Sequence, residues 1–74
     1  YRQRQRDQRR AEKEIKNLEK KIARLDDQKK ELNSKLLSET DPDEAVRLHQ
    51  QLTELDEQLS ESEHRWMELN AESS

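Results

Sequence analysis

Arginine and lysine crowd the first third of this sequence at a spacing that could bind a row of phosphate groups. On a helix, residues three and four apart share one face. At 1.5 Å per residue, the row formed by these side chains would be about 27 Å long. Such a row suits successive phosphates of a nucleic-acid backbone, with salt-sensitive affinity and no reading of base sequence. Its members, called here the basic stripe, are Arg6, Arg9, Lys13, Lys16, Lys20 and Arg24.

The apolar residues predict the helices that must carry this stripe. With Ile15 at heptad position a, and again with Ala45 at a, apolar residues recur at a and d. This period of 3.5 residues is typical of coiled-coil packing. Fourteen of the sixteen seam positions are apolar, and they take fourteen of the chain's twenty apolar residues. The seam is Ala11, Ile15, Leu18, Ile22, Leu25, Lys29, Leu32 and Leu36, then Ala45, Leu48, Leu52, Leu55, Leu59, Ser62, Trp66 and Leu69.

Between the two seams the rhythm slips, because Leu36 and Ala45 are nine residues apart. Asp41 suits an N-cap, and Pro42 suits the first helical position, where no N–H is needed. Glu44, three residues after Asp41, would complete a capping box. Helix one is therefore expected over about 11–38, a turn over 39–41 and helix two over about 42–71. Residues 1–10 form a basic lead-in that is either partly disordered or an extension of helix one.

A short link between arms of similar length favours antiparallel neighbours. The expected fold is all-α, a two-helix antiparallel coiled-coil hairpin that remains a monomer. The alternative is one continuous kinked rod that dimerises. In the hairpin, Ala11 and Ile15 should lie near Trp66 and Leu69, with Trp66 as a packing anchor for the first seam.

The acidic residues avoid the outer positions b, c and f of helix one. Up to Arg24 they all lie at e or g, and Asp27 and Glu31 end the stripe beyond it. Arg10 lies at another outer position, and Arg2 and Arg4 extend the charge toward the N-terminus. The candidate phosphate contacts are therefore Arg2, Arg4, Arg6, Arg9, Arg10, Lys13, Lys16, Lys20 and Arg24. An ordinary solvated face, which every coiled coil has, is the alternative interpretation.

Two features of the seam need a physical account. Lys29 could run along the seam with its ammonium in water, and Ser62 leaves room for a large neighbour. Both would specify register at some cost in stability. The e edges would also bring Glu19 and Asp26 toward Glu63 and Asp56, which is unfavourable unless the register differs or a cationic partner covers that edge.

Charge separates the two halves of the chain. Residues 1–10 carry +4, residues 11–37 carry +2 and residues 38–74 carry −9, which sum to −3. The outer face of helix two is acidic, with Glu54, Glu57, Glu61 and Glu68. It is unsuited to phosphates but could dock on a protein. A structural or protein-interaction coiled coil, a spacer or docking element without nucleic-acid binding, is thus the alternative function.

Composition excludes most other classes of function. The chain has no Gly for a phosphate-binding loop and no Cys for a disulfide or thiolate metal site. His49 and His64 are fifteen residues apart without an evident partner set. The apolar residues of both helices are expected to be buried in the seam, which leaves little apolar surface to insert into a membrane. We expect a non-enzymatic cytoplasmic domain without cofactor, metal, membrane or small-molecule substrate.

Several stretches together resemble a known family. These are the Arg/Gln-rich lead-in, the helix "EIKNLEKKIARLDDQKKELNSKL", the Asp41-Pro42 turn, and the closing "HRWMEL" with Trp66, Glu68 and Leu69. Over about residues 10–70 the chain is similar to the C-terminal coiled-coil domain of ABC-F ATPases, the Uup type in particular. The resemblance implies an appendage of a cytoplasmic protein whose tandem ATPase domains, the ATP-binding part, lie upstream. It also implies partners: DNA for the Uup type, and ribosomes for ABC-F proteins more widely.

Overall fold

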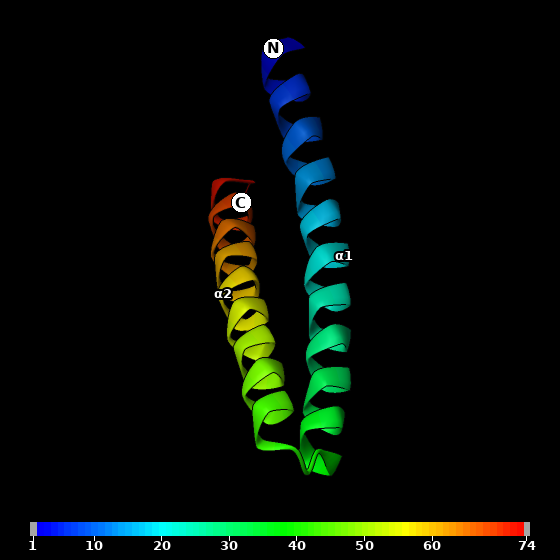
Figure 1. Ribbon diagram of the computed structural model, residues 1–74. Coiled ribbons are helices and arrows are strands. Elements are labelled where there is room, and N and C mark those ends of the chain that lie inside the picture. Colours follow the sequence, from blue (N-terminus) through cyan, green and yellow to red (C-terminus); the bar gives the residue numbers. More distant parts are fainter. Residues whose placement is uncertain (1, 74) are drawn as a thin grey trace.

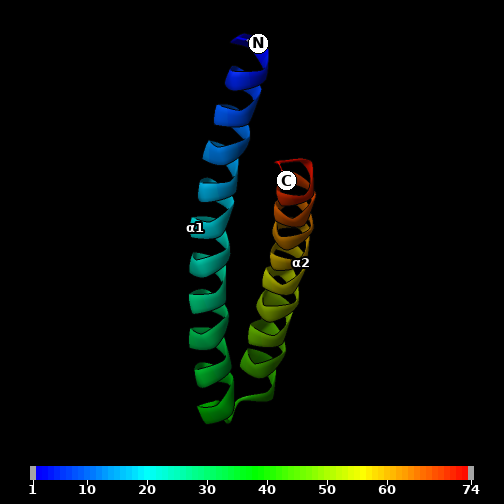
Figure 2. The ribbon, with the colours of Figure 1, turned by 180° about the vertical axis from the view of Figure 1, so that it is seen from behind.

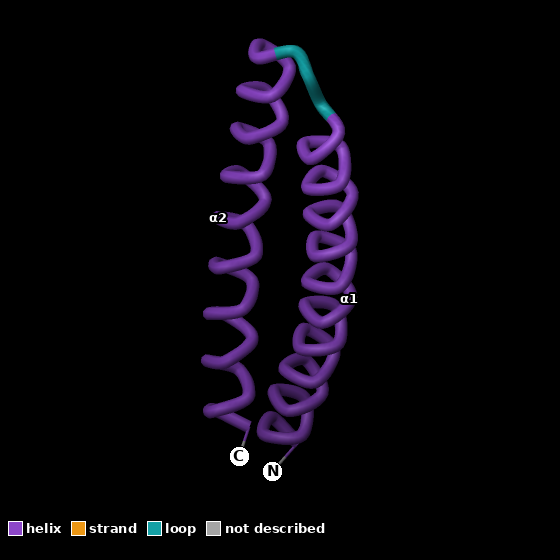
Figure 3. Tube along the Cα trace, turned by 90° about the horizontal axis from the view of Figure 1, so that it is seen from below, coloured by secondary structure: helices purple, strands orange, loops and turns teal. Residues whose placement is uncertain are grey.

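The chain folds into two long antiparallel helices. The computed structural model describes the backbone of residues 2–73 and the side chains of residues 9–72. Helix α1 spans Arg2–Ser38 and helix α2 spans Pro42–Ser73. They lie side by side in opposite directions in both ribbon views (Figure 1, Figure 2), and a single short link joins them (Figure 3). This confirms the all-α hairpin and excludes the continuous rod.

The apolar seam closes the hairpin along its length. All sixteen seam side chains are buried or half-buried. Outside the seam, the only described side chains that are not exposed are Glu39, Glu44 and Asn70. The most buried apolar residues are Leu25, Leu48, Leu52, Leu59 and Leu69. Burial therefore follows the 3.5-residue period, because each helix has only one neighbour against which to bury a face.

The link between the helices is built from local hydrogen bonds. The backbone N–H of Asp43 donates to Asp41 Oδ1 at 3.0 Å, and Ala45 N–H donates to the Asp41 carbonyl at 2.9 Å. Asp41 is thus the N-cap of α2, and Pro42 is its first residue. The backbone N–H groups of Thr40 and Asp41 donate to Glu39 Oε1, at 3.1 and 3.0 Å.

These bonds correct one detail of the predicted turn. Glu44 was expected to close a capping box by accepting from the Asp41 N–H, but that N–H is taken by Glu39. The Glu44 carboxylate instead pairs with Arg47, one turn further along α2, at 3.6 Å. Glu39 takes this place because it lies just before the cap and reaches two backbone donors at once.

Helix α1 continues past the end of α2. Its first turns, drawn in blue, stand beyond the C-terminal end of α2 (Figure 1, Figure 2). The backbone of the basic lead-in from Arg2 onward is part of α1. The molecule is a rod of about 60 × 14 × 14 Å. Its basic end therefore has no second helix beside it.

Candidate nucleic-acid interface

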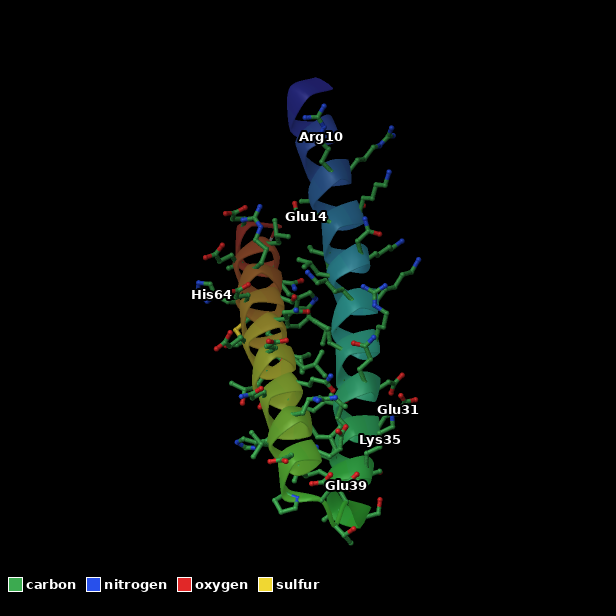
Figure 4. All side chains as sticks on the ribbon, in the orientation of Figure 1. Arg10, Glu14, Glu31, Lys35, Glu39 and His64 are labelled. Carbon is green, nitrogen blue, oxygen red and sulfur yellow. The ribbon has the colours of Figure 1, made fainter. Side chains whose placement is uncertain are left out.

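The basic stripe lies on the side of α1 that faces away from α2. Every stripe member with a described side chain is exposed, and so is Arg10: Arg9, Arg10, Lys13, Lys16, Lys20 and Arg24. Nitrogen-tipped side chains line this outer side of α1, and Arg10 lies beyond the end of α2 (Figure 4). The side chains of Arg2, Arg4 and Arg6 lie outside the described residues. Since α1 is continuous through all nine positions, its backbone holds the row straight.

Two acidic residues of α1, Glu14 and Glu19, contact α2 instead. Glu14 accepts a hydrogen bond from Arg65 Nε at 3.1 Å, across the two helices. Glu19 accepts one from Trp66 Nε1 at 3.2 Å. Asp26 pairs with Lys30, one turn along α1, at 3.5 Å. Contacts with α2 therefore hold the carboxylates of Glu14 and Glu19 away from the basic stripe.

No cation of the basic stripe with a described side chain is neutralised by a neighbour in the described part of the chain. Within 4 Å, the basic side chains that meet a carboxylate among the described residues are Lys29, Lys30, Arg47, His64 and Arg65. None of these belongs to the stripe. An exposed row of charges of one sign raises the local potential and attracts a polyanion.

The edge with the like charges contains its own counterion. Glu19, Asp26 and Glu63 line one groove there, as expected from the register. Lys29, from the seam, reaches out of it and pairs with Asp56 at 2.6 Å. The hydrogen bond from Lys29 to Asp56, together with the charge of Asp56, raises the pKa of Lys29. Lys29 thus offsets part of the repulsion expected at this edge.

Trp66 and the histidines occupy ordinary positions in α2. The indole of Trp66 is half-buried at its seam position, with its N–H held by Glu19. The ring therefore packs in the seam, and part of it lines a groove between the helices. His64 Nε2 lies 2.9 Å from Glu68 Oε1, one turn further on. Within the described residues, no group of three His, Cys, Asp or Glu side chains could hold a metal ion. None of the described helices is long and apolar enough to cross a membrane.

Sequence reasoning missed the role of Arg65. It links the helices through Glu14 and also contacts Glu68 at 3.4 Å. The hydrogen bond to Glu14 raises the pKa of the Arg65 guanidinium. Both Glu14 and Arg65 lie at position g, and in an antiparallel hairpin g flanks g as e flanks e. The pair could have been predicted by asking which charges face each other across the g edge, as was done for the e edge.

A basic, continuous α1 folded against an acidic α2 through a DP-capped turn is the architecture expected from the resemblance. Comparisons with curated proteins and with solved structures found no significant match. A family model does match, over residues 6–71, which includes the seam of both helices and the turn. The chain therefore belongs to the ABC transporter C-terminal domain family.

Proposed function

We propose that this chain is a non-catalytic nucleic-acid-binding hairpin, with DNA the favoured partner and structured RNA or the ribosome the other candidates. The observation that carries the proposal is the outer face of α1. The exposed cations of the basic stripe have no described counterion, while Glu14 and Glu19 of the same helix are held by contacts with α2. The basic stripe and Arg10 would contact phosphates, together with Arg2, Arg4 and Arg6.

Membership of the family supports a role as an appendage. The proposed parent is a cytoplasmic ABC-F-type ATPase of the Uup kind, whose ATPase domains would belong to the same chain. In that setting the hairpin supplies affinity for the nucleic acid, and hydrolysis of ATP takes place elsewhere. The hairpin needs no catalytic group of its own for this task.

The geometry of α1 suits phosphate binding without base recognition. Consecutive stripe residues rise by about 4.5–6 Å along the helix axis, as steps of three or four residues require. Lysine and arginine at such steps can follow a backbone, but they carry no information on base identity. The acidic face of α2 would keep the hairpin from binding through both sides, which leaves α1 as the single contact helix.

The test is a residue-resolved NMR titration of this chain with duplex DNA and with structured RNA, each at two salt concentrations. We expect amide shifts concentrated between Arg9 and Arg24, and their loss at the higher salt. The nucleic acid that produces the larger shifts at equal salt is the better partner. Absence of shifts with both ligands would support the structural or protein-docking coiled coil instead. Shifts centred on the acidic face of α2 would refute the assigned surface.

A further inference from the structure

A groove runs along one side of the hairpin, between α1 and the C-terminal half of α2. Its volume is about 470 Å³. The floor is apolar and consists of Ile22, Ala23, Leu59, Trp66 and Met67. Met67, at the outer position b next to Trp66, is 59% exposed and leaves apolar surface open at the groove. The groove lies at the e edge and reaches Ala23 at the outer position b of α1, but no residue of the basic stripe lines it.

The rim of the groove is acidic. Glu19 and Asp26 stand on the α1 side and Glu63 on the α2 side. Asp56 lies close by, because its partner Lys29 also experiences the charges of Asp26 and Glu63. Lys29 and Lys30 supply two positive charges, through their pairs with Asp56 and Asp26. Four carboxylates against two ammonium groups leave this edge at −2.

Size and charge together select the occupant. From Glu19 to Asp26 the groove extends over about 10 Å of helix, which is enough for one or two side chains and too short for a docked helix face. The occupant must therefore be a cation with apolar surface. Lysine offers a compact, strongly hydrated charge, whereas the planar guanidinium of arginine stacks on aromatic rings and binds carboxylates with two hydrogen bonds.

We propose that this groove binds an arginine of a partner protein, presented beside an apolar residue. The guanidinium lies over the Trp66 ring and pairs with the carboxylates of Glu63 and Asp26. The neighbouring apolar side chain covers Met67 and Leu59. The like charges that the hairpin brings together at this edge are thereby offset by the partner.

The proposal does not rest on nucleic-acid binding. The residues of the groove and of the basic stripe do not overlap, and the ligands have opposite charge. An arginine-bearing segment bound here would leave the basic stripe free, so the hairpin could hold a protein and a nucleic acid at the same time.

The chain offers a direct reporter of occupancy, because Trp66 is its only tryptophan. The probe is the peptide acetyl-Leu-Arg-Ala-Leu-Arg-Leu-amide, titrated into the chain while Trp66 emission is followed. A peptide with citrulline in place of both arginines keeps the shape and removes the charge. We expect a saturable emission change with the arginine peptide, and at least tenfold weaker binding of the citrulline peptide.

Two double variants locate the site. Asp26→Asn with Glu63→Gln removes two rim charges and relieves repulsion, so the fold should persist by circular dichroism. It should weaken the arginine peptide about tenfold. Glu57→Gln with Glu61→Gln removes the same charge from the exposed outer face of α2 and should change affinity less than twofold. Equal losses in both variants, equal affinity for the citrulline peptide, or no response of Trp66 would each overturn the proposal.

Discussion

Lys29 illustrates how one side chain can reconcile two conflicting demands. As a seam residue it costs apolar burial, but its stem follows the seam and its ammonium reaches Asp56 on the opposite helix. The contact reaches position e of the opposite helix, where a slip of one heptad would put His49 or Glu63 in the place of Asp56. A lysine that seems out of place in the first seam therefore favours alignments that put a carboxylate opposite it and disfavours the slip that puts His49 there.

Exchanging the charges of this pair tests the role of Lys29. Lys29→Glu adds a fifth carboxylate to the acidic edge and should lower the thermal midpoint followed by circular dichroism. Adding Asp56→Lys restores an ion pair of reversed polarity, and the double variant should recover most of the loss. A double variant with the same thermal midpoint as Lys29→Glu alone would show that the ion pair does not stabilise the hairpin.

The same pair predicts a dependence on pH. The folded state raises the pKa of Lys29 above its ordinary value of 10.5. A raised pKa contributes stability that is fully present below 10.5 and is lost as the pH rises through the folded value. The stability difference between the wild type and Lys29→Gln should therefore be constant at neutral pH and shrink above pH 10.5. A difference that persists unchanged at the higher pH would contradict this account.

At the scale of the elements, the turn decides where the acidic helix begins. Asp41 satisfies one of the N–H groups that a helix N-terminus leaves unpaired, and Glu39 satisfies two more in the link. Asp43 and Glu44 in the first turn of α2 add negative charge at the positive end of the helix dipole. Together with Pro42, these residues start α2 shortly after the last residue of α1, at Ser38.

The cap can be tested by a matched pair of substitutions. Asp41→Ala removes the side-chain acceptor and should cost about 1 kcal/mol of unfolding free energy, the usual value for an N-cap. Asp41→Asn keeps an acceptor oxygen in the same place and should cost only a small part of that. Chemical denaturation of the two variants gives the comparison. Equal losses would mean that the charge of Asp41, rather than its hydrogen bond, stabilises the turn.

For the whole molecule, sequence periodicity was a reliable guide to the fold and a weaker one to the surfaces. The seam could be predicted because burial in a two-helix hairpin depends only on heptad position, and every seam residue from Ala11 to Leu69 follows it. The sequence could not show that Glu39, rather than Glu44, accepts from the Asp41 N–H, because this depends on the path of the three link residues. Nor could the groove beside Trp66, which depends on how far Trp66 and Met67 extend from α2.

The proposed function depends on one asymmetry of the molecule, which has a basic outer side on α1 and a carboxylate-rich α2. The most direct measurement is the slope of log affinity for duplex DNA against log salt concentration. Lys13→Gln, Lys16→Gln and Lys20→Gln together remove three stripe charges. Lys30→Gln, Lys35→Gln and Arg47→Gln remove the same net charge from exposed positions outside the stripe.

Each neutralised phosphate contributes about 0.9 to the steepness of this slope. The stripe variant would neutralise three fewer phosphates, so its slope should become shallower by about 2.7. The control variant should keep nearly the slope of the wild type, and both variants should keep their helical circular dichroism. A stripe variant with the wild-type slope, or equal changes in the two variants, would contradict the assignment of the basic stripe as the nucleic-acid interface.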